Sequence, residues 1–480
     1  MASERRIARA LALWTACALS ACTAVPRDAG FAEAAALARE RGGHELAWRR
    51  GGPEDAELDR RVRALAAEEL SPESAVEIAL LSNRRLQALY AELGFAQADL
   101  LAAARLPNPL VHAELRFPDG GGRSALDLGL EQSFLSLLWM PLRKRMAADA
   151  FEAAKLRVTA GALALASETR AAYRRLQGDQ QLVELRKTSL AAAEASFELA
   201  QRLHTAGNIR DLDLALERAQ REEARVAVAD AELAASEQRE ALAALLGLYG
   251  GEAELRVSAR LPELPPSAGA TEELEARVIA NSLALAATRH EIERAGRALG
   301  LADHQALVPE LELGLAAERE SEGRWELGPS LGLRLPLFSQ GQPEKRRAAA
   351  ELERLRETYL ADAVELRSHL RHAALRVVAL HARASFLRDV LLPLRGEVLD
   401  GFQLEYNAMQ EGAFRLLVAK RDQLAAAAAY VATLTDYWVA SSELDGLLEG
   451  APSHGAAAPL SAHSAALPVS SAFTATSDAH

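Results

Sequence analysis

Residues 107–131 read PNPLVHAELRFPDGGGRSALDLGLE, and this stretch decides the fold. Prolines end the preceding segment, and apolar and polar residues then alternate on both sides of a glycine-rich turn. Alternation with a period of two is typical of strands that have one apolar and one polar face. The pattern returns further along, where leucines recur at odd-numbered positions between Leu311 and Leu337. The sequence therefore predicts two β-hairpins, at about 110–134 and about 310–338.

The predicted strands have a length that suits a membrane. Each spans about 9–11 residues, which is what a tilted strand needs to cross a bilayer. Aromatic residues stand near the strand ends, where interfacial side chains of membrane strands gather. These are Phe117, Phe134, Trp139, Trp325 and Phe338. The alternative is a pair of soluble hairpins that pack against helices.

Four strands per chain set a limit on how such a sheet can exist in lipid. They are too few to close a barrel, and an open sheet edge exposes unpaired backbone groups that lipid cannot satisfy. Two chains supply eight strands, which leave an interior filled by side chains, whereas three supply twelve. If the chains enclose an open duct, twelve strands, and therefore three chains, are favoured.

A long helical segment follows each hairpin. In the first, Leu176, Val183, Leu190 and Phe197 recur every seven residues. In the second, apolar residues step by three and four, which is the seam that a coiled coil requires, although an ordinary amphipathic core helix is the alternative. Pro393 lies within this seam and predicts a kink or a helix junction. The second seam consists of Val377, Leu380, Ala384, Leu387, Leu391, Leu394 and Val398.

The two halves repeat one order of elements, at a spacing of about 200 residues. A helix is predicted from Ser71 to Arg105, with Ser71 as its N-cap, and a second opens likewise from Thr271. After each hairpin and long helix, a short break at 206–209 or 406–412 precedes a return helix. The predicted organisation is a signal peptide at 1–21, an extended N-terminal arm or linker at 22–70, a first repeat at 71–250, a linker at 251–270, a second repeat at 271–450 and a disordered tail at 451–480.

The N-terminus reads as a secretory signal. Basic residues precede an apolar run, Ala10 to Leu19, that is too short to span a bilayer. The run ends in Leu19-Ser20-Ala21-Cys22, the pattern of a bacterial lipobox, in which the cysteine is acylated. Thr23 follows instead of Asp, so we expect delivery to the outer membrane. The alternative is an ordinary signal peptide with an incidental cysteine.

Composition excludes several classes of protein. Half of the residues are hydrophobic but only 5% are aromatic, which is typical of long helices, and the net charge of −12 argues against nucleic acid as a partner. Past the signal, no apolar run of 18 residues indicates a membrane helix. We find no phosphate-binding loop, no nucleophilic constellation and no paired-cysteine zinc spacing. The sequence predicts no enzyme, no cofactor and no metal site.

The lipobox, the duplicated unit and the proline before each hairpin together resemble the TolC family of outer-membrane efflux proteins, over roughly residues 71–450. The breaks at 206–212 and 406–410 resemble those of members found with heavy-metal efflux systems. The resemblance implies a mainly α fold with a small β part: a coiled-coil helical tunnel and four transmembrane strands per chain, which close a 12-stranded barrel as a homotrimer. It implies a lipid-anchored protein of the cell outer membrane, with most of its mass in the periplasm.

The implied function is passive conduction of drugs or metal ions in a tripartite efflux system. The implied partners are outer-membrane lipid, a periplasmic adaptor (membrane fusion) protein and an inner-membrane pump of the resistance-nodulation-division type. The alternative is a periplasmic coiled-coil adaptor or scaffold lipoprotein without channel activity, which the two membrane-length hairpins disfavour. The cargo is not encoded in this chain, because selectivity resides in the pump and the adaptor.

The resemblance places both breaks at a periplasmic tip, where the tunnel narrows and meets the adaptor. Carboxylates of Asp211, Asp213 and Glu411 would form threefold rings that attract cations, whereas the alternative for an Asp after a break is stabilisation of the helix dipole. The candidate site residues are Cys22 for lipidation, and Gly207, Asn208, Asp211, Asp213, Gln410, Glu411 and Gly412 for the gate or adaptor contact. Glu365, His369 and His372 share one helix face, but such charges are usually solvated.

Overall fold

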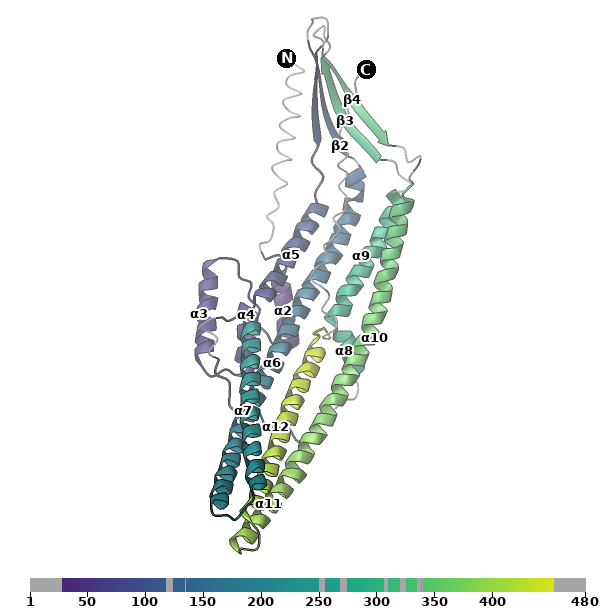
Figure 1. The fold of residues 1–480 in the computed structure, drawn as a ribbon. Coiled ribbons are helices and arrows are strands. Elements are labelled where there is room, and N and C mark those ends of the chain that lie inside the picture. The colour runs from purple at the N-terminus through teal and green to yellow at the C-terminus, as the bar shows by residue number, and fades with distance from the viewer. Residues whose placement is uncertain are drawn as a thin grey trace.

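The structure is a computed structural model that describes residues 28–117, 124–133, 135–249, 255–267, 274–305, 310–319, 325–334, 338 and 340–452. The predicted signal peptide, Cys22, Phe134, Thr271 and the tail beyond 452 lie outside the described residues. The molecule is elongated, with a small sheet at one end and paired helices that run to the opposite end (Figure 1).

The two predicted hairpins are confirmed and pair with each other. The first consists of β1 (Leu110–Arg116) and β2 (Ala125–Ser133), and the second of β3 (Glu310–Arg319) and β4 (Trp325–Arg334). They form one antiparallel sheet in the order β1-β2-β3-β4. Among the described strands, β1 and β4 each have one outer edge without a strand partner.

A long helical segment follows each hairpin, as the sequence predicts. The first pair is α6 (Leu135–Thr205), with 71 residues, and α7 (Asp211–Leu246). At 1.5 Å per residue, α6 is about 107 Å long. The second pair comprises α10 (Gln342–Phe386), a π-helical turn η2 (Leu387–Leu391), α11 (Leu392–Asn407) and α12 (Ala413–Glu449). Among the helices that the structure describes, none is long and apolar enough to span a bilayer.

The second seam is continuous only as far as η2. Val377, Ala384 and Leu387 are buried, whereas Leu394 and Val398, beyond the predicted junction at Pro393, are 51% and 37% exposed. A π-helical turn adds one residue to the helix and rotates everything beyond it by about a quarter turn. The sequence step of three and four therefore leaves the buried face after Leu391. The predicted junction at Pro393 is confirmed, because α11 begins there.

The predicted helix from Ser71 to Arg105 is divided at Asn83 into α4 (Pro72–Ser82) and α5 (Arg84–Ala103). The predicted N-cap is confirmed, because Ser71 and Ser74 form a reciprocal capping box. Asn83 caps α5 by accepting a hydrogen bond from the Leu86 N–H (3.0 Å), and its amide donates to the Leu245 carbonyl (2.8 Å). The second half is divided likewise, into α8 (Leu274–Asn281) and α9 (Leu283–Gln305). Through the Asn83 amide, the junction of α4 and α5 is hydrogen-bonded to the C-terminal end of α7.

The N-terminal arm is not extended over its described part, which corrects the prediction. It contains α2 (Phe31–Gly42) and α3 (Pro53–Ala67). Small residues bring α2 close to α6, and Ala34 and Ala38 are buried. Phe31 packs edge-on against Tyr90 of α5, with ring centroids 5.0 Å apart. Alanine-mediated packing leaves little hydrophobic periodicity, so the sequence pattern did not reveal these helices.

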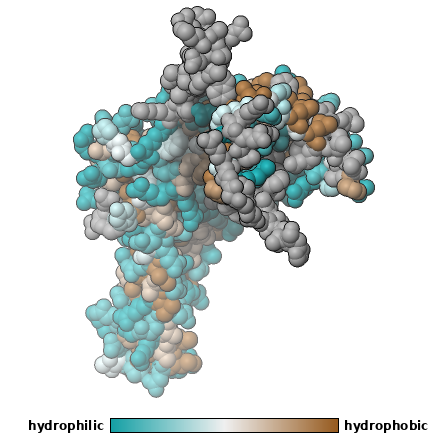
Figure 2. Space-filling view, turned by 90° about the horizontal axis from the view of Figure 1, so that it is seen from above, coloured by the Kyte–Doolittle hydropathy of each residue, from teal (hydrophilic) through white to brown (hydrophobic). Residues whose placement is uncertain are grey.

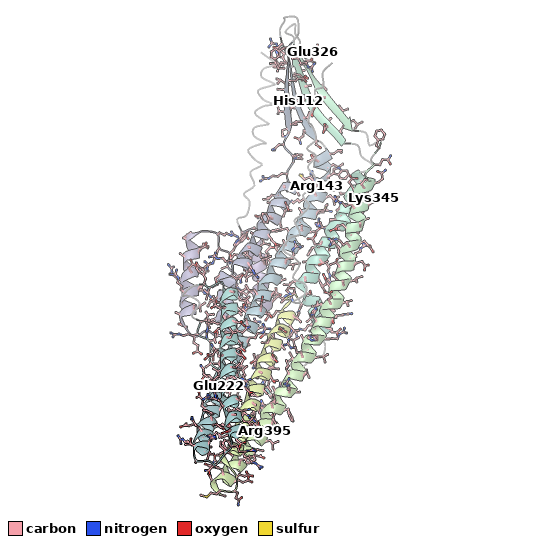
Figure 3. The ribbon with its side chains drawn as sticks, viewed as in Figure 1. His112, Arg143, Glu222, Glu326, Lys345 and Arg395 are labelled. Atoms are coloured by element: carbon pink, nitrogen blue, oxygen red, sulfur yellow. The ribbon has the colours of Figure 1, made fainter. Side chains whose placement is uncertain are left out.

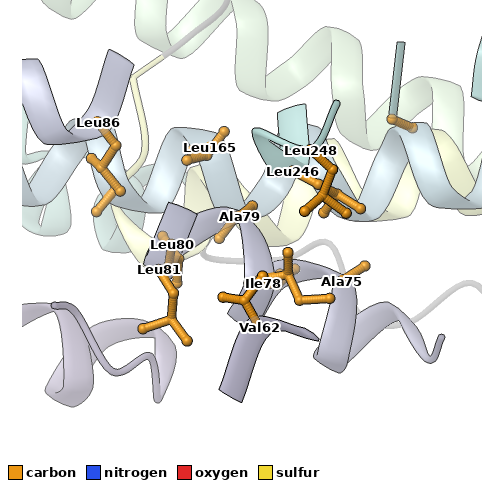
Figure 4. Close-up of a cluster of buried hydrophobic side chains, with 14 of the residues drawn as sticks. Val62, Ala75, Ile78, Ala79, Leu80, Leu81, Leu86, Leu165, Leu246 and Leu248 are labelled. Atoms are coloured by element: carbon orange, nitrogen blue, oxygen red, sulfur yellow. The ribbon is translucent and has the colours of Figure 1, made fainter. Parts of the chain in front are cut away.

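The largest core cluster lies at mid-height, where α4 meets α3, α5, α6 and the end of α7 (Figure 4). Ile78 and Leu80 of α4 are 0% and 1% exposed, and Leu246 of α7 is fully buried. Each such side chain contributes about 1.5–3 kcal/mol through burial. Because α4 is buried on nearly every side, this cluster anchors the N-terminal helices to the long pair α6 and α7.

A half-buried cluster of polar side chains predicts how stability depends on pH. The Nε2 atom of His44 lies 2.9 Å from Nη2 of Arg170, and Arg170 also donates to Glu449 (3.1 Å). Burial and the Arg170 charge lower the pKa of His44 from 6.5 to about 4. The unfolded chain therefore takes up the His44 proton first, and stability is lost as the pH falls from about 6.5 to about 4.

We expect His44→Gln to reduce this loss, as measured by chemical denaturation at pH 7 and pH 4.5. Burial raises the pKa of Asp445 and of Glu449, which acts in the opposite direction on acidification. The quantity to compare between the variant and the wild type is therefore the loss of unfolding free energy from pH 7 to pH 4.5. His372→Gln, at an exposed position, serves as the control and should retain the wild-type pH dependence. Equal pH dependence in His44→Gln and the wild type would contradict the assignment.

Candidate functional site

One face of the sheet is apolar in all four strands. Strand register places Val111 opposite Leu130, Leu130 opposite Leu315 and Leu315 opposite Pro329. Directly opposed residues share a face, so these four form one apolar row. A parallel row consists of Ala113, Leu128, Ala317 and Leu327, and a further pair consists of Leu313 and Leu331.

This apolar face is exposed. Val111, Leu327 and Leu331 are 69%, 77% and 67% exposed, and none of the described helices covers them. In the view from above, hydrophobic residues gather on the part of the molecule nearest the viewer, which is the sheet end (Figure 2). A contiguous apolar patch of this kind is a contact surface for lipid or for another protein.

The opposite face of the sheet is polar and carries a row of carboxylates. Glu114 pairs with Asp127, Asp127 with Glu318, and Glu318 with Glu326, one from each strand. Arg116 is the neighbouring basic residue, 2.9 Å from Glu114 and 4.0 Å from Asp127. His112 and Glu326 mark this sheet in Figure 3. A row of acids that faces away from the apolar side suits an aqueous surface.

Glycines on the polar face allow close approach of neighbouring groups. The His112 ring lies directly over Gly129, where a β carbon would overlap it, and a β carbon on Gly314 would lie 2.7 Å from the Leu130 carbonyl oxygen. Side chains at these positions would force the backbones apart. The polar face thus carries small residues at points where strands and side chains approach closely, whereas the other face carries leucines.

Basic and aromatic residues mark the junction of sheet and helices. Arg143 near the start of α6 and Lys345 near the start of α10 lie just beyond the sheet (Figure 3). Lys345 pairs with Asp303 at 2.7 Å. Trp139 stacks on His304 at the same level, with ring centroids 6.1 Å apart. At the far end of the strands, Phe117 and Trp325 are 76% and 55% exposed, so aromatics stand at both ends of the apolar face.

The predicted tip residues lie together at the end opposite the sheet (Figure 1). Gly207 and Asn208 form the turn between α6 and α7, and Gln410, Glu411 and Gly412 precede α12. Gly207 has φ of +74°, which favours glycine. The Asn208 N–H donates to the Leu203 carbonyl at 2.9 Å and closes the end of α6.

Met409 was not among the predicted tip residues, yet it has the most unusual conformation there. Its φ is +59° and its side chain is 94% exposed. The left-handed region costs a non-glycine residue about 1–3 kcal/mol. Met409 ends α11 where Gly207 ends α6, and only an alignment of the two turns would have pointed to it.

The acidic tip residues differ in their surroundings. Asp213 accepts hydrogen bonds from the Arg210 backbone and side chain (both 3.2 Å), which lower the pKa of Asp213. Glu411 pairs with Arg415 at 2.8 Å. Asp211 is 98% exposed on its side chain, with His204 Nε2 at 2.6 Å. Asp213 is therefore a helix cap, and Asp211 is the carboxylate that projects farthest into solvent.

Apolar stripes along the long helices remain exposed in the part of the chain that the structure describes. On α7, Leu212, Leu216, Val226 and Leu233 are each 56–60% exposed. A shallow groove beside Val226 is lined by Ala219, Glu222, Glu223, Ala227 and Asp230. Glu222 on α7 and Arg395 on α11 mark the two neighbouring hairpins near the tip (Figure 3). On α10, Leu360, Val364 and Leu375 are 56–70% exposed.

The histidines singled out on α10 do not converge. Glu365, His369 and His372 are exposed, and they do not form a group of close ligand atoms. Within the part of the chain that the structure describes, Asp149, His290 and Glu293 are the group of acids and histidine that does converge. Asp149 and His290 come from different halves of the sequence, so no local motif could have indicated them.

Comparison with known proteins gives the following relatives. No protein-family model matches the chain. It is 24% identical over 394 residues to the cobalt-zinc-cadmium resistance protein CzcC of Cupriavidus metallidurans, covering 80% of this chain and 91% of that protein. Among solved structures, the outer-membrane channel OprN has a TM-score of 0.66 at 20% identity, over 84% of this chain and 94% of that one. The open state of the Neisseria gonorrhoeae MtrE outer membrane channel has a TM-score of 0.64 at 19% identity, over 81% and 89%.

Proposed function

We propose that this chain is the outer-membrane channel of a tripartite efflux system. The proposal is supported by the similarity of the chain, in sequence and fold, to outer-membrane channels of the TolC family. This similarity confirms the predicted resemblance. The observation that carries the proposal is the exposed apolar sheet face, which runs unbroken across four strands at one end of long helical pillars. Lipid is the environment in which such a face is stable.

The proposed assembly is a homotrimer whose strands close a 12-stranded barrel. The outer edges of β1 and β4 need strand partners, and a second copy offers the complementary edge. The two unlike faces of the sheet support closure with the carboxylates inward and the leucines outward. The apolar stripes on α7 and α10 support contacts between neighbouring chains along a helical tunnel.

The proposed path runs from a periplasmic adaptor and an inner-membrane pump, at the tip, to the outside, at the sheet. The pump, of the resistance-nodulation-division type, supplies the energy, and the channel conducts passively. Cys22 is the proposed lipid anchor, and the helices lie in the periplasm. We propose that the halves at 71–250 and 271–450 are duplicates, a view supported by their shared order of helix, hairpin, long helix and return helix. The name of CzcC favours divalent metal ions over drugs as cargo.

The test is native mass spectrometry and planar-bilayer conductance on protein extracted from outer membranes. We expect a lipid-modified trimer with small or gated conductance. A soluble or monomeric species without conductance would overturn the channel and favour the periplasmic scaffold instead.

Charge at the tip predicts the ion preference of that channel. A trimer presents Asp211 three times, and exposed rings of like charge concentrate counterions. Asp211→Asn is expected to lower the cation-to-anion permeability ratio about twofold, as measured by reversal potentials in a salt gradient. Asp213→Asn is the matched control: it removes the charge that pairs with Arg210 but leaves Asp211 in place, so we expect little change in the permeability ratio. A lower permeability ratio in Asp213→Asn but not in Asp211→Asn would assign the ring of charge to Asp213.

A further inference from the structure

A group of potential metal ligands lies between the two halves of the chain. Asp149 projects from α6, and His290 and Glu293 project from α9, one helical turn apart. One ligand atom from each lies within 4.8 Å of the other two. Positions i and i+3 share a helix face, so the backbone of α9 holds two of the ligands toward the third.

One of these groups lacks a partner. The Nδ1 atom of His290 is buried and has no hydrogen-bond partner. Asp149 is only 9% exposed, and its Oδ2 atom is paired with Arg297. Buried polar atoms without partners are rare, because each loses its hydration without compensation. An ion held between the three side chains would satisfy the His290 nitrogen and replace Arg297 as the partner of Asp149.

The donor set selects the kind of ion. One imidazole nitrogen and two carboxylate oxygens suit a divalent transition metal, whereas Ca²⁺ and Mg²⁺ prefer oxygen ligands alone. Two carboxylates balance the charge of one such cation. In a tetrahedral zinc site, neighbouring ligand atoms are roughly 3.4 Å apart. Small side-chain rotations would contract the present group to that size and leave the fourth position to water.

Arg297 now occupies the place of a cation. Its guanidinium contacts the Asp149 carboxylate and lies 3.3 Å from Glu293 Oε2. The Arg297 side chain is 34% exposed, so it can turn outward to solvent without crossing the core. A metal ion and Arg297 would therefore compete for the same two carboxylates.

We propose that Asp149, His290 and Glu293 bind a divalent transition-metal ion such as Zn²⁺, and that Arg297 neutralises the site when the metal is absent. Because the ligands come from α6 and α9, the bound ion links the first half of the chain to the second. The site is in the wall between helices, and its occupancy does not depend on whether the assembly conducts.

The experiment is a titration of the full-length, detergent-solubilised protein, purified without a polyhistidine tag. Zn²⁺ binding is measured by calorimetry, and Co²⁺ reports the coordination geometry through its visible absorption. We expect one site per chain, with the intense bands of four-coordinate Co²⁺. His290→Ala should weaken Zn²⁺ binding by about 100-fold or more. His372→Ala, on the exposed face of α10, is the matched control and should bind as the wild type does.

If His290→Ala fails to fold, Arg297→Gln provides a second test of the metal site. Removal of the competing cation should tighten Zn²⁺ binding, by about tenfold. Under a purely structural role, in which Arg297 only bridges two acids, the variant would be less stable and would bind no more Zn²⁺. Wild-type affinity in a folded His290→Ala variant would overturn the proposal, because the metal would then be bound elsewhere, as would unchanged affinity in Arg297→Gln.

Discussion

Arginine at both Leu128 and Leu331 is expected to abolish insertion of the sheet into the outer membrane. Both leucines lie on the apolar face near the middle of their strands, β2 and β4. An arginine at the midplane of a bilayer costs about 2–4 kcal/mol on the lipid face of a strand, and each assembly would carry the pair once per chain. The measurement is the fraction of protein in purified outer membranes, compared with wild type.

A neighbouring position provides the control for that experiment. Ser330 precedes Leu331 but lies on the polar face, so Ser330→Arg adds the same charge to the proposed aqueous side. We expect Ser330→Arg to insert, and Leu331→Arg alone to insert poorly. Normal insertion of the double arginine variant would show that the apolar face does not contact lipid, and equal defects in both single variants would point to general disruption of the strand.

Gly178→Leu is expected to separate the two long hairpins. Gly178 is buried where α6 crosses α12, and a β carbon there would lie 2.8 Å from Cβ of Thr435 and overlap its hydroxyl. The crossing is reinforced where Ser167 donates to the Ser442 carbonyl at 2.9 Å. Overpacking of a tight helix contact costs about 3 kcal/mol. The measurement is the free energy of unfolding in guanidinium, together with the yield of assembled protein.

Gly296→Leu is the matched control, because a β carbon on this glycine of α9 meets no atom within 4 Å. Leucine there should stabilise the helix by about 0.5–1 kcal/mol, since glycine is a poor helix former. If Gly178→Leu were as stable as Gly296→Leu, the close approach of α6 and α12 would not be a determinant of the fold.

The features predicted correctly from sequence are those that local patterns determine. Period-two alternation gave both hairpins, and the cap at Ser71 and the breaks near Gly207 and Gln410 gave the helix ends, because each depends on a few adjacent residues. The exposure of Leu394 could not be predicted. It follows from a single extra residue in the helical turn at 387–391, for which the sequence carries no marker other than Pro393.

The site was predictable in position but not in detail. Turn chemistry placed Asp211 and Asp213 at a helix start, yet only the structure separates the capped carboxylate from the projecting one. The convergence of Asp149 with His290 depends on how α6 packs on α9, which no short motif encodes. The division of the first helix at Asn83 was missed for the same reason, because its hydrogen-bond partner belongs to the distant end of α7.

The long helices that follow the two hairpins differ in where they can bend. α6 is one continuous helix of 71 residues whose internal proline, Pro141, lies near its start, whereas its counterpart changes to a π-helical turn at Leu387–Leu391 before α11 begins. Prolines and interruptions of the regular hydrogen-bond ladder are where helices bend. We therefore expect the second helix to bend partway to the tip, at Leu387–Leu391, and the first to bend only near the sheet.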